Sequence, residues 1–168
     1  MKNPQIPTYF STFETPLGEF SVAVDPTQRL VAAVFGGRAT IRSRVPQGPL
    51  VEDRSRTADA RAQLKDWFRG KRQDISLPLA PAGSAFQHRV WSALVSIPYG
   101  QTRSYGVIAK ALRTSARAVG RANATNPICV VVPCHRVIGA DGSLTGYAYG
   151  EDRKKALLEL ESRALRRP

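Results

Sequence analysis

Nine residues, Ile128-Cys129-Val130-Val131-Val132-Pro133-Cys134-His135-Arg136, carry the strongest structural and chemical signal of this chain. The apolar run at their start predicts a buried strand, which the thiol of Cys134 and the imidazole of His135 closely follow. A thiol is a strong nucleophile only as the thiolate, and about 3% of it is ionised at pH 7 at its reference pKa. A neighbouring base that lowers this pKa increases the reactive fraction. A small buried cysteine without a chemical role is the alternative that the pair alone leaves open.

The positive charge of the chain is unevenly distributed. The 168 residues carry a formal net charge of +12 at pH 7, and no Asp or Glu occurs between Asp74 and Asp141. A basic surface without carboxylates favours a polyanionic partner, most simply nucleic acid. A charged face that only keeps the protein in solution is the competing interpretation. The basic residues of this stretch are Arg89, Arg103, Lys110, Arg113, Arg117, Arg121 and Arg136.

Composition argues against several classes of protein. The hydrophobic fraction is 42%, which is normal for a globular protein, and no apolar run approaches the ~20 residues that a membrane-spanning helix needs. Residues 1–10 contain two prolines and no apolar core, so we expect no secretory signal. The two cysteines, Cys129 and Cys134, are therefore expected to be free thiols in a reducing compartment.

Residues 1–80 are expected to form a small α/β domain with an antiparallel sheet. Turn residues separate three short strands, which are predicted at 9–15, 19–25 and 30–35. A loop rich in Gly, Pro and Arg is predicted at 36–51, and a further strand at 75–79. Thr57 is expected to cap a helix that ends at Gly70, with an inner face formed by Ala60, Leu64, Trp67 and Phe68.

Residues 84–168 are expected to be mostly helical. Ser84 and Gln87 predict a capping box at the start of a first helix. Two shorter helices, at 104–112 and 115–124, have the pattern of a helix-turn-helix, although many such pairs only pack together. A hairpin with an Asp-Gly turn is predicted at 138–145. The last helix is predicted at 152–165, with Glu161 at the edge of an apolar stripe formed by Ala156, Leu157, Leu160 and Ala164.

The helix predicted at 115–124 has an unusual composition. Its inner stripe is predicted to be Ala118, Val119 and Ala122, and Arg117 and Arg121, one turn apart, point the other way. Small residues also occur along it, which would let the helix approach a nucleic acid backbone closely. Close packing against another helix is the alternative. A glycine within a helix costs roughly 1 kcal/mol relative to Ala, and close approach would account for it at Gly120.

Several segments of the second half, in their order and spacing, closely resemble the O6-alkylguanine-DNA alkyltransferases, the methylated-DNA–protein-cysteine methyltransferases. The first half is similar only in size and in the order of its strands and helix. The segments are Ala85-Phe86-Gln87-His88-Arg89-Val90-Trp91-Ser92-Ala93-Leu94, Ile97-Pro98-Tyr99-Gly100, Thr102-Arg103-Ser104-Tyr105, Arg117-Ala118-Val119-Gly120, Asn126-Pro127, Val132-Pro133-Cys134-His135-Arg136-Val137-Ile138-Gly139, Thr145-Gly146-Tyr147 and Leu157-Leu158-Glu159-Leu160-Glu161.

The resemblance implies a ribonuclease H-like α/β domain over residues 1–80 and a helical, DNA-binding and alkyl-accepting domain over residues 84–168. It implies a DNA repair activity without a cofactor, in which the alkyl group on O6 of guanine in duplex DNA passes irreversibly to the protein's own cysteine. Each molecule then acts once. O4-alkylthymine is a second lesion that the resemblance allows. We expect a monomer without a membrane partner, located in the cytoplasm, and at the nucleoid in a bacterial host.

The resemblance also implies the catalytic roles by matching position. Cys134 is the acceptor, and His135 removes its proton through a water. Glu161 orients the imidazole, and Asn126 holds the turn that carries the cysteine. Tyr105 helps to move the 3′ phosphate and donates its hydroxyl proton to the leaving guanine.

The second helix of the helix-turn-helix is implied to dock in the minor groove of DNA. Arg117 would then enter the base stack in place of the extruded guanine. The other residues implied to contact DNA, besides Tyr105, are Thr102, Ser104, Ala118, Gly120, Arg121 and Arg136. The alkylguanine pocket is implied to be lined by Val137, Tyr147, Ala148 and Tyr149.

Two departures from the family pattern affect these expectations. Members often carry a glycine where Tyr149 stands, so we expect a tight pocket that handles methyl well and bulky benzyl-type adducts poorly. Some members hold zinc in the first domain, but residues 1–80 contain neither Cys nor His, so we expect no metal site.

Three other functions are the alternatives. A DNA-lesion binder without transfer activity lacks the reactive cysteine in its known relatives, whereas Cys134 is present here. A helix-turn-helix transcription factor does not account for the adjacent cysteine and histidine. A cysteine hydrolase does not account for the basic stretch between Asp74 and Asp141.

Overall fold

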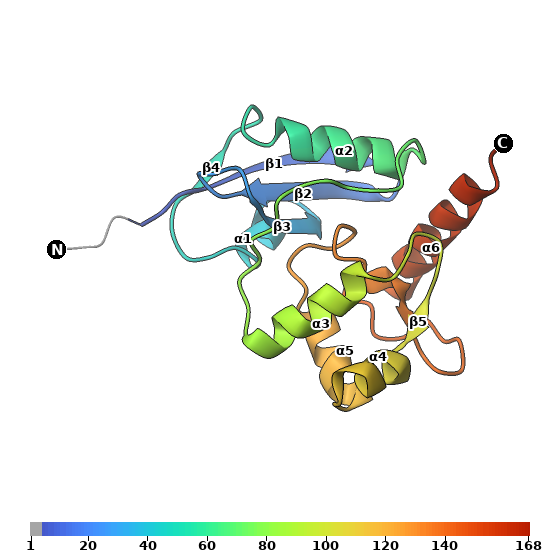
Figure 1. Cartoon of the computed structure of the whole chain (residues 1–168). Coiled ribbons are helices and arrows are strands. Elements are labelled where there is room, and N and C mark those ends of the chain that lie inside the picture. Colours follow the sequence, from blue (N-terminus) through green and yellow to red (C-terminus); the bar gives the residue numbers. More distant parts are fainter. Residues whose placement is uncertain (1–4) are drawn as a thin grey trace. The chain divides into compact units, whose positions relative to one another are not determined.

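The computed structural model describes residues 5–168, so the first four residues of the domain expected at 1–80 lie outside the described residues. The chain divides between Ala82 and Gly83 into two compact units (Figure 1).

The first unit is built on a four-stranded sheet in the order β3-β2-β1-β4. Strands β1 (Thr8–Thr15), β2 (Gly18–Val24) and β3 (Leu30–Phe35) are antiparallel neighbours. Strand β4 (Leu50–Glu52) pairs in parallel with β1. The sheet is therefore mixed rather than antiparallel throughout, because the chain returns to the β1 edge after residues 36–49 and runs along it in the same direction.

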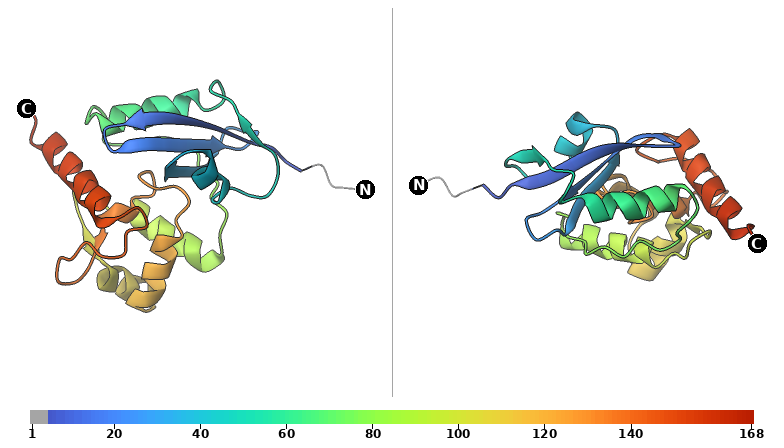
Figure 2. Two further views of the ribbon diagram at one scale, coloured as in Figure 1. Left: turned by 180° about the vertical axis from the view of Figure 1, so that it is seen from behind. Right: turned by 90° about the horizontal axis from the view of Figure 1, so that it is seen from above.

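Helix α2 (Ala58–Phe68) covers one face of this sheet (Figures 1 and 2). The ring of Phe68 packs edge-on against the ring of Phe20 in β2, with the centroids 5.3 Å apart. Thr57 precedes the helix without capping it, since its hydroxyl instead donates to the Asp53 carbonyl at 2.9 Å. The predicted inner face is confirmed, because the buried residues of α2 include Ala60, Leu64, Trp67 and Phe68.

Two segments of the first unit differ from their prediction. The loop expected at 36–51 contains the short helix α1 (Arg38–Arg42), which buries Ile41. The strand expected at 75–79 is reduced to a single bridge between Leu79 and Leu30. The reason lies in a side chain that sequence patterns do not reveal: the amide of Gln63 binds both the backbone N–H and the carbonyl of Ser76.

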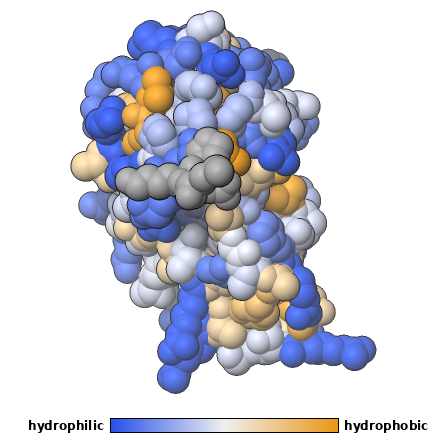
Figure 3. Space-filling view, turned by 90° about the vertical axis from the view of Figure 1, so that its left-hand side faces the viewer, coloured by the Kyte–Doolittle hydropathy of each residue, from blue (hydrophilic) through white to orange (hydrophobic). Residues whose placement is uncertain are grey.

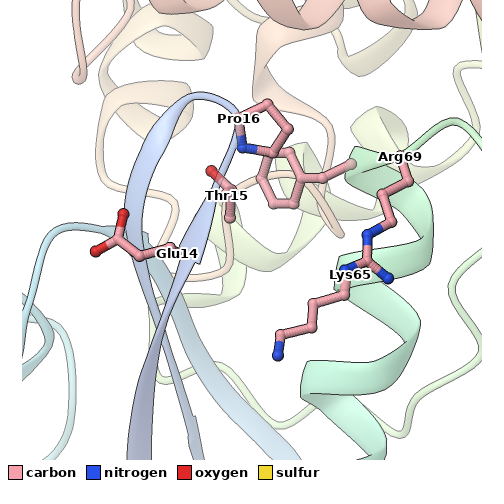
Figure 4. A pocket seen from close by; sticks show the side chains of 6 residues that line it. Glu14, Thr15, Pro16, Lys65 and Arg69 are labelled. Atoms are coloured by element: carbon pink, nitrogen blue, oxygen red, sulfur yellow. The ribbon is translucent and has the colours of Figure 1, made fainter.

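A small hollow of about 250 Å³ lies in the first unit where the turn after β1 faces α2. Figure 4 shows Lys65 and Arg69 extending from α2, with Glu14, Thr15 and Pro16 across from them. The hollow is lined by charged, polar and apolar groups but by no cysteine or histidine. Within residues 5–168, no group of three or more His, Cys, Asp or Glu side chains is arranged to hold a metal ion.

The second unit packs three helices against one another, α3 (Ala85–Val95), α4 (Tyr105–Leu112) and α5 (Ala116–Ala124) (Figures 1 and 2). The predicted capping box of α3 is confirmed, as is the cap that the Ser115 hydroxyl gives α5. The turn between α4 and α5 passes through Arg113, whose φ of 56° places it in the left-handed region. The pair α4–α5 is the predicted helix-turn-helix.

Two further elements complete the second unit. Strand β6 (Val137–Ile138) pairs in parallel with β5 (Arg103–Ser104). The hairpin expected at 138–145 is not formed. Strand β6 pairs with β5 instead, and the chain after β6 makes only a tight turn, in which the Gly139 N–H donates to the Ser143 carbonyl. Helix α6 (Glu151–Leu165) buries Lys154, Leu157 and Glu161. Of the apolar stripe expected there, Leu157 is buried, whereas Ala156, Leu160 and Ala164 are half-buried.

The described surface shows no broad apolar face in the view of Figure 3. Hydrophilic side chains cover most of that face, and the hydrophobic ones form small, separate groups. Among the helices of residues 5–168, none combines the length and the apolar character that crossing a membrane requires.

Candidate active site and nucleic-acid interface

The apolar run before Cys134 forms a buried turn and not the expected strand. Val132 N–H donates to the Ile128 carbonyl at 2.9 Å, which closes the turn. Val130 has a φ of 73°, a left-handed conformation that is strained for a β-branched residue. Periodicity cannot distinguish such a buried turn from a buried strand, since both are uniformly apolar.

Asn126 supplies the hydrogen bonds that stabilise this turn. Its side-chain Nδ2 donates to the Val132 carbonyl at 2.8 Å, and its Oδ1 accepts from the Ile128 N–H at 3.0 Å. The side chain is 3% exposed, so these bonds form out of water. The turn ends at Pro133, and the chain then enters a short 3-10 helix over Cys134–Arg136. The position of Cys134 therefore depends on Asn126.

His135 and Glu161 meet in the interior of the second unit, and Cys134 directly precedes His135. Cys134 is 4% exposed, and both His135 and Glu161 are fully buried. His135 Nε2 lies 2.7 Å from Glu161 Oε1 on helix α6. A carboxylate can only accept, so Nε2 carries the proton and Nδ1 is the basic nitrogen of the ring.

Arg136 binds the same carboxylate. Its Nε and Nη2 donate to Glu161 Oε1 at 3.0 and 2.8 Å, and its Nη1 donates to the Ile97 carbonyl at 2.7 Å. We expected Arg136 to contact DNA, and that contact stays a prediction, although the side chain is buried in the structure. The guanidinium is directed inward, because the buried charge of Glu161 needs a counter-charge.

Glu161 also ties the site to the turn after α3. Its Oε2 accepts from the backbone N–H of Gly100 at 2.9 Å. The Arg136 guanidinium lies 5.5 Å from the ring centre of Tyr99 in the same turn. One carboxylate thus joins three segments that are far apart in sequence.

The pKa directions of His135 and Glu161 determine the protonation states of this network. Burial lowers the pKa of His135 and outweighs the opposing effect of Glu161. Burial alone would raise the pKa of Glu161, but the hydrogen bonds from His135 and Arg136, together with the positive charge of Arg136, bring it below its ordinary value. At neutral pH the site therefore holds an ionised Glu161, a charged Arg136 and a neutral imidazole that can accept a proton.

Tyr105 begins helix α4 and is partly buried. Its hydroxyl donates to the Thr145 carbonyl at 3.2 Å. Burial, followed by the charge of Cys134, raises the pKa of Tyr105, so the phenol keeps its proton. A protonated phenol that senses the charge on the cysteine can serve as a hydrogen-bond donor beside it.

A groove of about 480 Å³ runs along helix α5 in the second unit. Arg117 and Arg121 are exposed along it, and Gly120 opens its floor toward Tyr105. A Cβ at Gly120 would lie 3.9 Å from the Tyr105 ring, an ordinary contact, so helix packing alone does not require glycine there. The groove therefore combines positive charge with a low floor, as an approaching phosphate backbone requires.

The remaining predicted site residues occupy varied positions. Ser104 caps α4 by accepting from the Val107 N–H at 3.2 Å, and Thr102 and Ala118 are partly exposed. Val137 is fully buried, and Ala148 is exposed.

Two tyrosines of the predicted pocket pack against each other. The Tyr147 and Tyr149 rings are 5.7 Å apart. Tyr147 is 8% exposed, and its hydroxyl has no hydrogen-bond partner among the residues that the structure describes. Burial and the charge of Cys134 raise its pKa well above the ordinary value. Tyr147 is thus a buried, neutral donor close to the cysteine.

Sequence reasoning missed two residues of the site. The side-chain Nδ2 of Asn123 donates to the Cys134 carbonyl at 3.4 Å from within α5. Lys154 is fully buried in α6. Each was detectable as a polar residue at an inward helical position, since Asn123 lies four residues after Val119 and Lys154 three before Leu157.

Comparisons with known proteins agree over both units. Residues 8–81 match the ribonuclease-like domain of 6-O-methylguanine DNA methyltransferase, and residues 85–163 match the DNA binding domain of that family. A methylated-DNA–protein-cysteine methyltransferase of Methanosarcina acetivorans is 45% identical over 155 residues, covering 91% of this chain and 97% of the relative. An inducible one from Bacillus subtilis is 47% identical over 125 residues, covering 73% and 70%. The crystal structure of Mycobacterium tuberculosis OGT in complex with DNA is similar with a TM-score of 0.83 and 40% identity, covering 93% and 94%.

Proposed function

This chain belongs to the 6-O-methylguanine DNA methyltransferase family, the methylated-DNA–protein-cysteine methyltransferases of DNA repair, and on that premise we propose that Cys134 is its alkyl acceptor. The observation that carries the proposal is the convergence of His135 and Arg136 on the single carboxylate of Glu161. The carboxylate fixes the imidazole that directly follows the cysteine, and Arg136 neutralises the charge. This arrangement prepares a base beside a thiol, as nucleophilic transfer requires.

The chemical step is an in-line displacement at the alkyl carbon. His135 takes the proton of the Cys134 thiol, through a water in this family. The sulfur then forms a bond to the alkyl carbon while the bond from that carbon to O6 breaks. The electron pair of the broken bond stays on guanine, and a proton reaches the departing base, which Tyr105 supports as a donor. The product is a thioether, which no group of the site can cleave, so each molecule acts once and needs no cofactor.

The substrate base reaches Cys134 by leaving the duplex. Helix α5 docks in the minor groove, where the floor at Gly120 permits close approach. Arg117 fills the space that the extruded base leaves, while Arg121 contacts a phosphate. Flipping costs a few kcal/mol, and occupation of the gap offsets part of that cost. The Tyr147 hydroxyl supports the proposal that the base leaves the duplex, because it has no hydrogen-bond partner in the described structure and can donate to the flipped base.

The proposed substrate is O6-alkylguanine in duplex DNA, with O4-alkylthymine as a second lesion. Val137, Tyr147, Ala148 and Tyr149 would line the pocket, and the protein would act as a monomer. Because the substrate is genomic DNA, the proposed place of action is the cytoplasm, at the nucleoid in a bacterium.

The experiment compares two cysteine variants on methylated duplex DNA. Cys134→Ser is expected to lose methyl transfer entirely and to bind DNA nearly as tightly as the parent protein, because the groove along α5 is intact. Cys129→Ser is the matched control, since Cys129 is also buried and unoxidised but lies in the turn before the site. It is expected to retain transfer. Demethylation by Cys134→Ser would show that another residue is the acceptor.

A further inference from the structure

The side chain of Asn123 is buried on the inner face of helix α5 and has no role in the steps described so far. It is 3% exposed, and its Nδ2 donates to the Cys134 carbonyl at 3.4 Å. A carbonyl oxygen can only accept, so the amide must present its nitrogen, and not its oxygen, to Cys134. The residue that carries the proposed acceptor thiol therefore fixes the orientation of the Asn123 amide.

The nitrogen of this amide has a second acceptor in Tyr105. The Tyr105 hydroxyl donates to the Thr145 carbonyl at 3.2 Å. It also has a hydrogen bond with the Asn123 side chain, which opposes the rise that burial, followed by the charge of Cys134, causes in the Tyr105 pKa. A hydrogen bond that lowers the pKa of a phenol is one that the phenol oxygen accepts. Asn123 Nδ2 thus serves both the Cys134 backbone and the Tyr105 phenol.

The oxygen of the same amide is not used. Asn123 Oδ1 is buried and has no hydrogen-bond partner among the residues that the structure describes. A buried polar atom without a partner is rare in proteins and costs free energy, so it needs an explanation. Asn123 lies one turn after Gly120, where an added Cβ would be 3.9 Å from the Tyr105 ring. The unused acceptor therefore belongs to the part of α5 that faces Tyr105 and Cys134.

The flipped base can supply the missing donor. In the proposed reaction the alkyl carbon of O6-alkylguanine meets the sulfur of Cys134, so the base lies beside the residue to which Asn123 donates. Alkylation at O6 leaves N1 of the ring without a proton, and N3 and N7 are acceptors. The only N–H groups of this base are therefore those of its exocyclic 2-amino group. A buried acceptor such as Oδ1 can recognise the base through that amine alone.

We propose that Asn123 is a specificity-determining residue of alkyl transfer, whose buried Oδ1 accepts a hydrogen bond from the 2-amino group of the flipped O6-alkylguanine. The role rests on the proposed function, because the base must enter the site to make this contact. Asn123 forms and breaks no covalent bond. It holds one edge of the base, while its Nδ2 holds the Cys134 carbonyl and Tyr105. A base without the amine would leave Oδ1 unpaired, and the site is expected to react with it more slowly.

The test compares methyl transfer from two duplexes that differ in one group. One contains O6-methylguanine, and the other contains O6-methylhypoxanthine, which lacks the 2-amino group. The measured quantity is the ratio of the two single-turnover rates. Asn123→Leu has nearly the same size but no acceptor, and it is expected to lower this ratio by about tenfold relative to the parent protein. Both proteins meet the same two duplexes, so differences in the cost of flipping cancel in the comparison.

Two control variants separate recognition of the amine from a structural role. Asn123→Asp keeps an acceptor, so it is expected to keep the ratio of the parent protein, although both rates fall because the Cys134 carbonyl loses its donor. Gln87→Ala removes another side-chain amide that binds the end of α5, where Gln87 Nε2 donates to Thr125 Oγ1 at 2.9 Å. It is also expected to keep the ratio. A purely structural role of Asn123 would lower both rates by the same factor in Asn123→Leu.

Thermal melting verifies that the variants fold, and Asn123→Ala is a second, smaller variant without an acceptor. Should these variants transfer methyl too slowly to measure, the same ratio is obtained from binding. The affinities of the two duplexes are then compared for Cys134→Ser with and without the change at Asn123.

The outcomes distinguish the role of Asn123 from the proposed function. An unchanged ratio in folded Asn123→Leu or Asn123→Ala overturns the role of Asn123 and leaves the proposed function intact. A ratio that falls as far in Asn123→Asp as in Asn123→Leu contradicts recognition by Oδ1. Absence of transfer by the parent protein from the O6-methylguanine duplex overturns the proposed function instead.

Discussion

Glu161 organises the site at the scale of single residues. It accepts from His135, Arg136 and the Gly100 backbone, and it is fully buried. Removal of one partner of a buried ion pair typically costs about 3–5 kcal/mol, because the other charge is left uncompensated. The site and the fold of the second unit therefore depend on the same carboxylate.

This network makes the free energy of unfolding depend on pH. The pKa of His135 is lowered in the folded protein by burial. Below its unfolded pKa of about 6.5, the unfolded chain takes up a proton that the folded chain does not. Stability is therefore expected to fall as the pH decreases below 6.5, by up to about 1.4 kcal/mol per pH unit for this proton. The lowered pKa of Glu161 has the same sign and adds its loss below the unfolded pKa of about 4.3.

Urea unfolding at pH 7 and at pH 5 measures this effect. The control is His88→Asn, which alters an exposed histidine and is expected to keep the loss of stability on acidification. His135→Asn is expected to reduce that loss. Equal stability of the parent protein at both pH values would contradict a neutral, buried His135.

The residue scale also shows what sequence could predict. The grouping of Cys134, His135 and Glu161 was available by position from the family resemblance, and the structure shows the contact of His135 with Glu161 beside a buried Cys134. The inward direction of Arg136 was not available, because its neighbours in sequence do not reveal that a carboxylate 25 residues later needs its charge.

At the scale of elements, helix α5 is the proposed DNA-reading element. Arg117 and Arg121 lie one turn apart on its exposed face, and both line the groove. The two residues allow a matched comparison of variants, because both are exposed arginines of the same groove but only Arg117 is proposed to enter the base stack.

We expect Arg117→Ala to slow methyl transfer from duplex DNA by roughly tenfold or more, because loss of about 1.4 kcal/mol of compensation for flipping has that effect. Transfer from the free base O6-methylguanine is expected to be nearly unchanged. Arg121→Ala is expected to weaken binding to duplex and to make it less dependent on salt. Equal slowing of Arg117→Ala on duplex and on free base would exclude the stacking role.

The loop between β6 and α6 is proposed to set the size of adduct that the pocket accepts. Tyr149 packs against Tyr147, which is buried close to Cys134. Tyr149→Gly is expected to increase the transfer rate from O6-benzylguanine while it changes the rate from O6-methylguanine little. The measurement is the ratio of the two rates in the parent protein and the variant. Equal rates on both adducts in the parent protein would refute a tight pocket.

The elements differ in how well they could be predicted. The capping box at Ser84 and the cap at Ser115 were predicted correctly, because a cap is a local interaction between residues that are close together in sequence. The strand expected at 128–132 and the hairpin expected at 138–145 were wrong. Asn126 and the partner strand β5 determine those segments, and neither contributes to the apolar and turn patterns from which the strand and the hairpin were predicted.

At the scale of the whole molecule, the proposed functional residues are confined to one of the two units. Every proposed catalytic and DNA-binding residue lies in the second unit, between Thr102 and Glu161. The first unit has its own sheet and aromatic core. Its first three strands could be predicted from short strand-forming runs separated by turn residues, whereas the parallel pairing of β4 depends on a contact between segments some 40 residues apart in sequence.

One sulfur atom of this protein is proposed to take an alkyl group permanently from damaged guanine. Intact-protein mass spectrometry after incubation with O6-methylguanine duplex tests this directly, followed by digestion to locate the change. We expect a gain equal to one methylene group per molecule, confined to the peptide that contains Cys134, together with one repaired guanine. An unmodified protein mass beside repaired DNA, or a methyl group on any other residue, would contradict the role of Cys134.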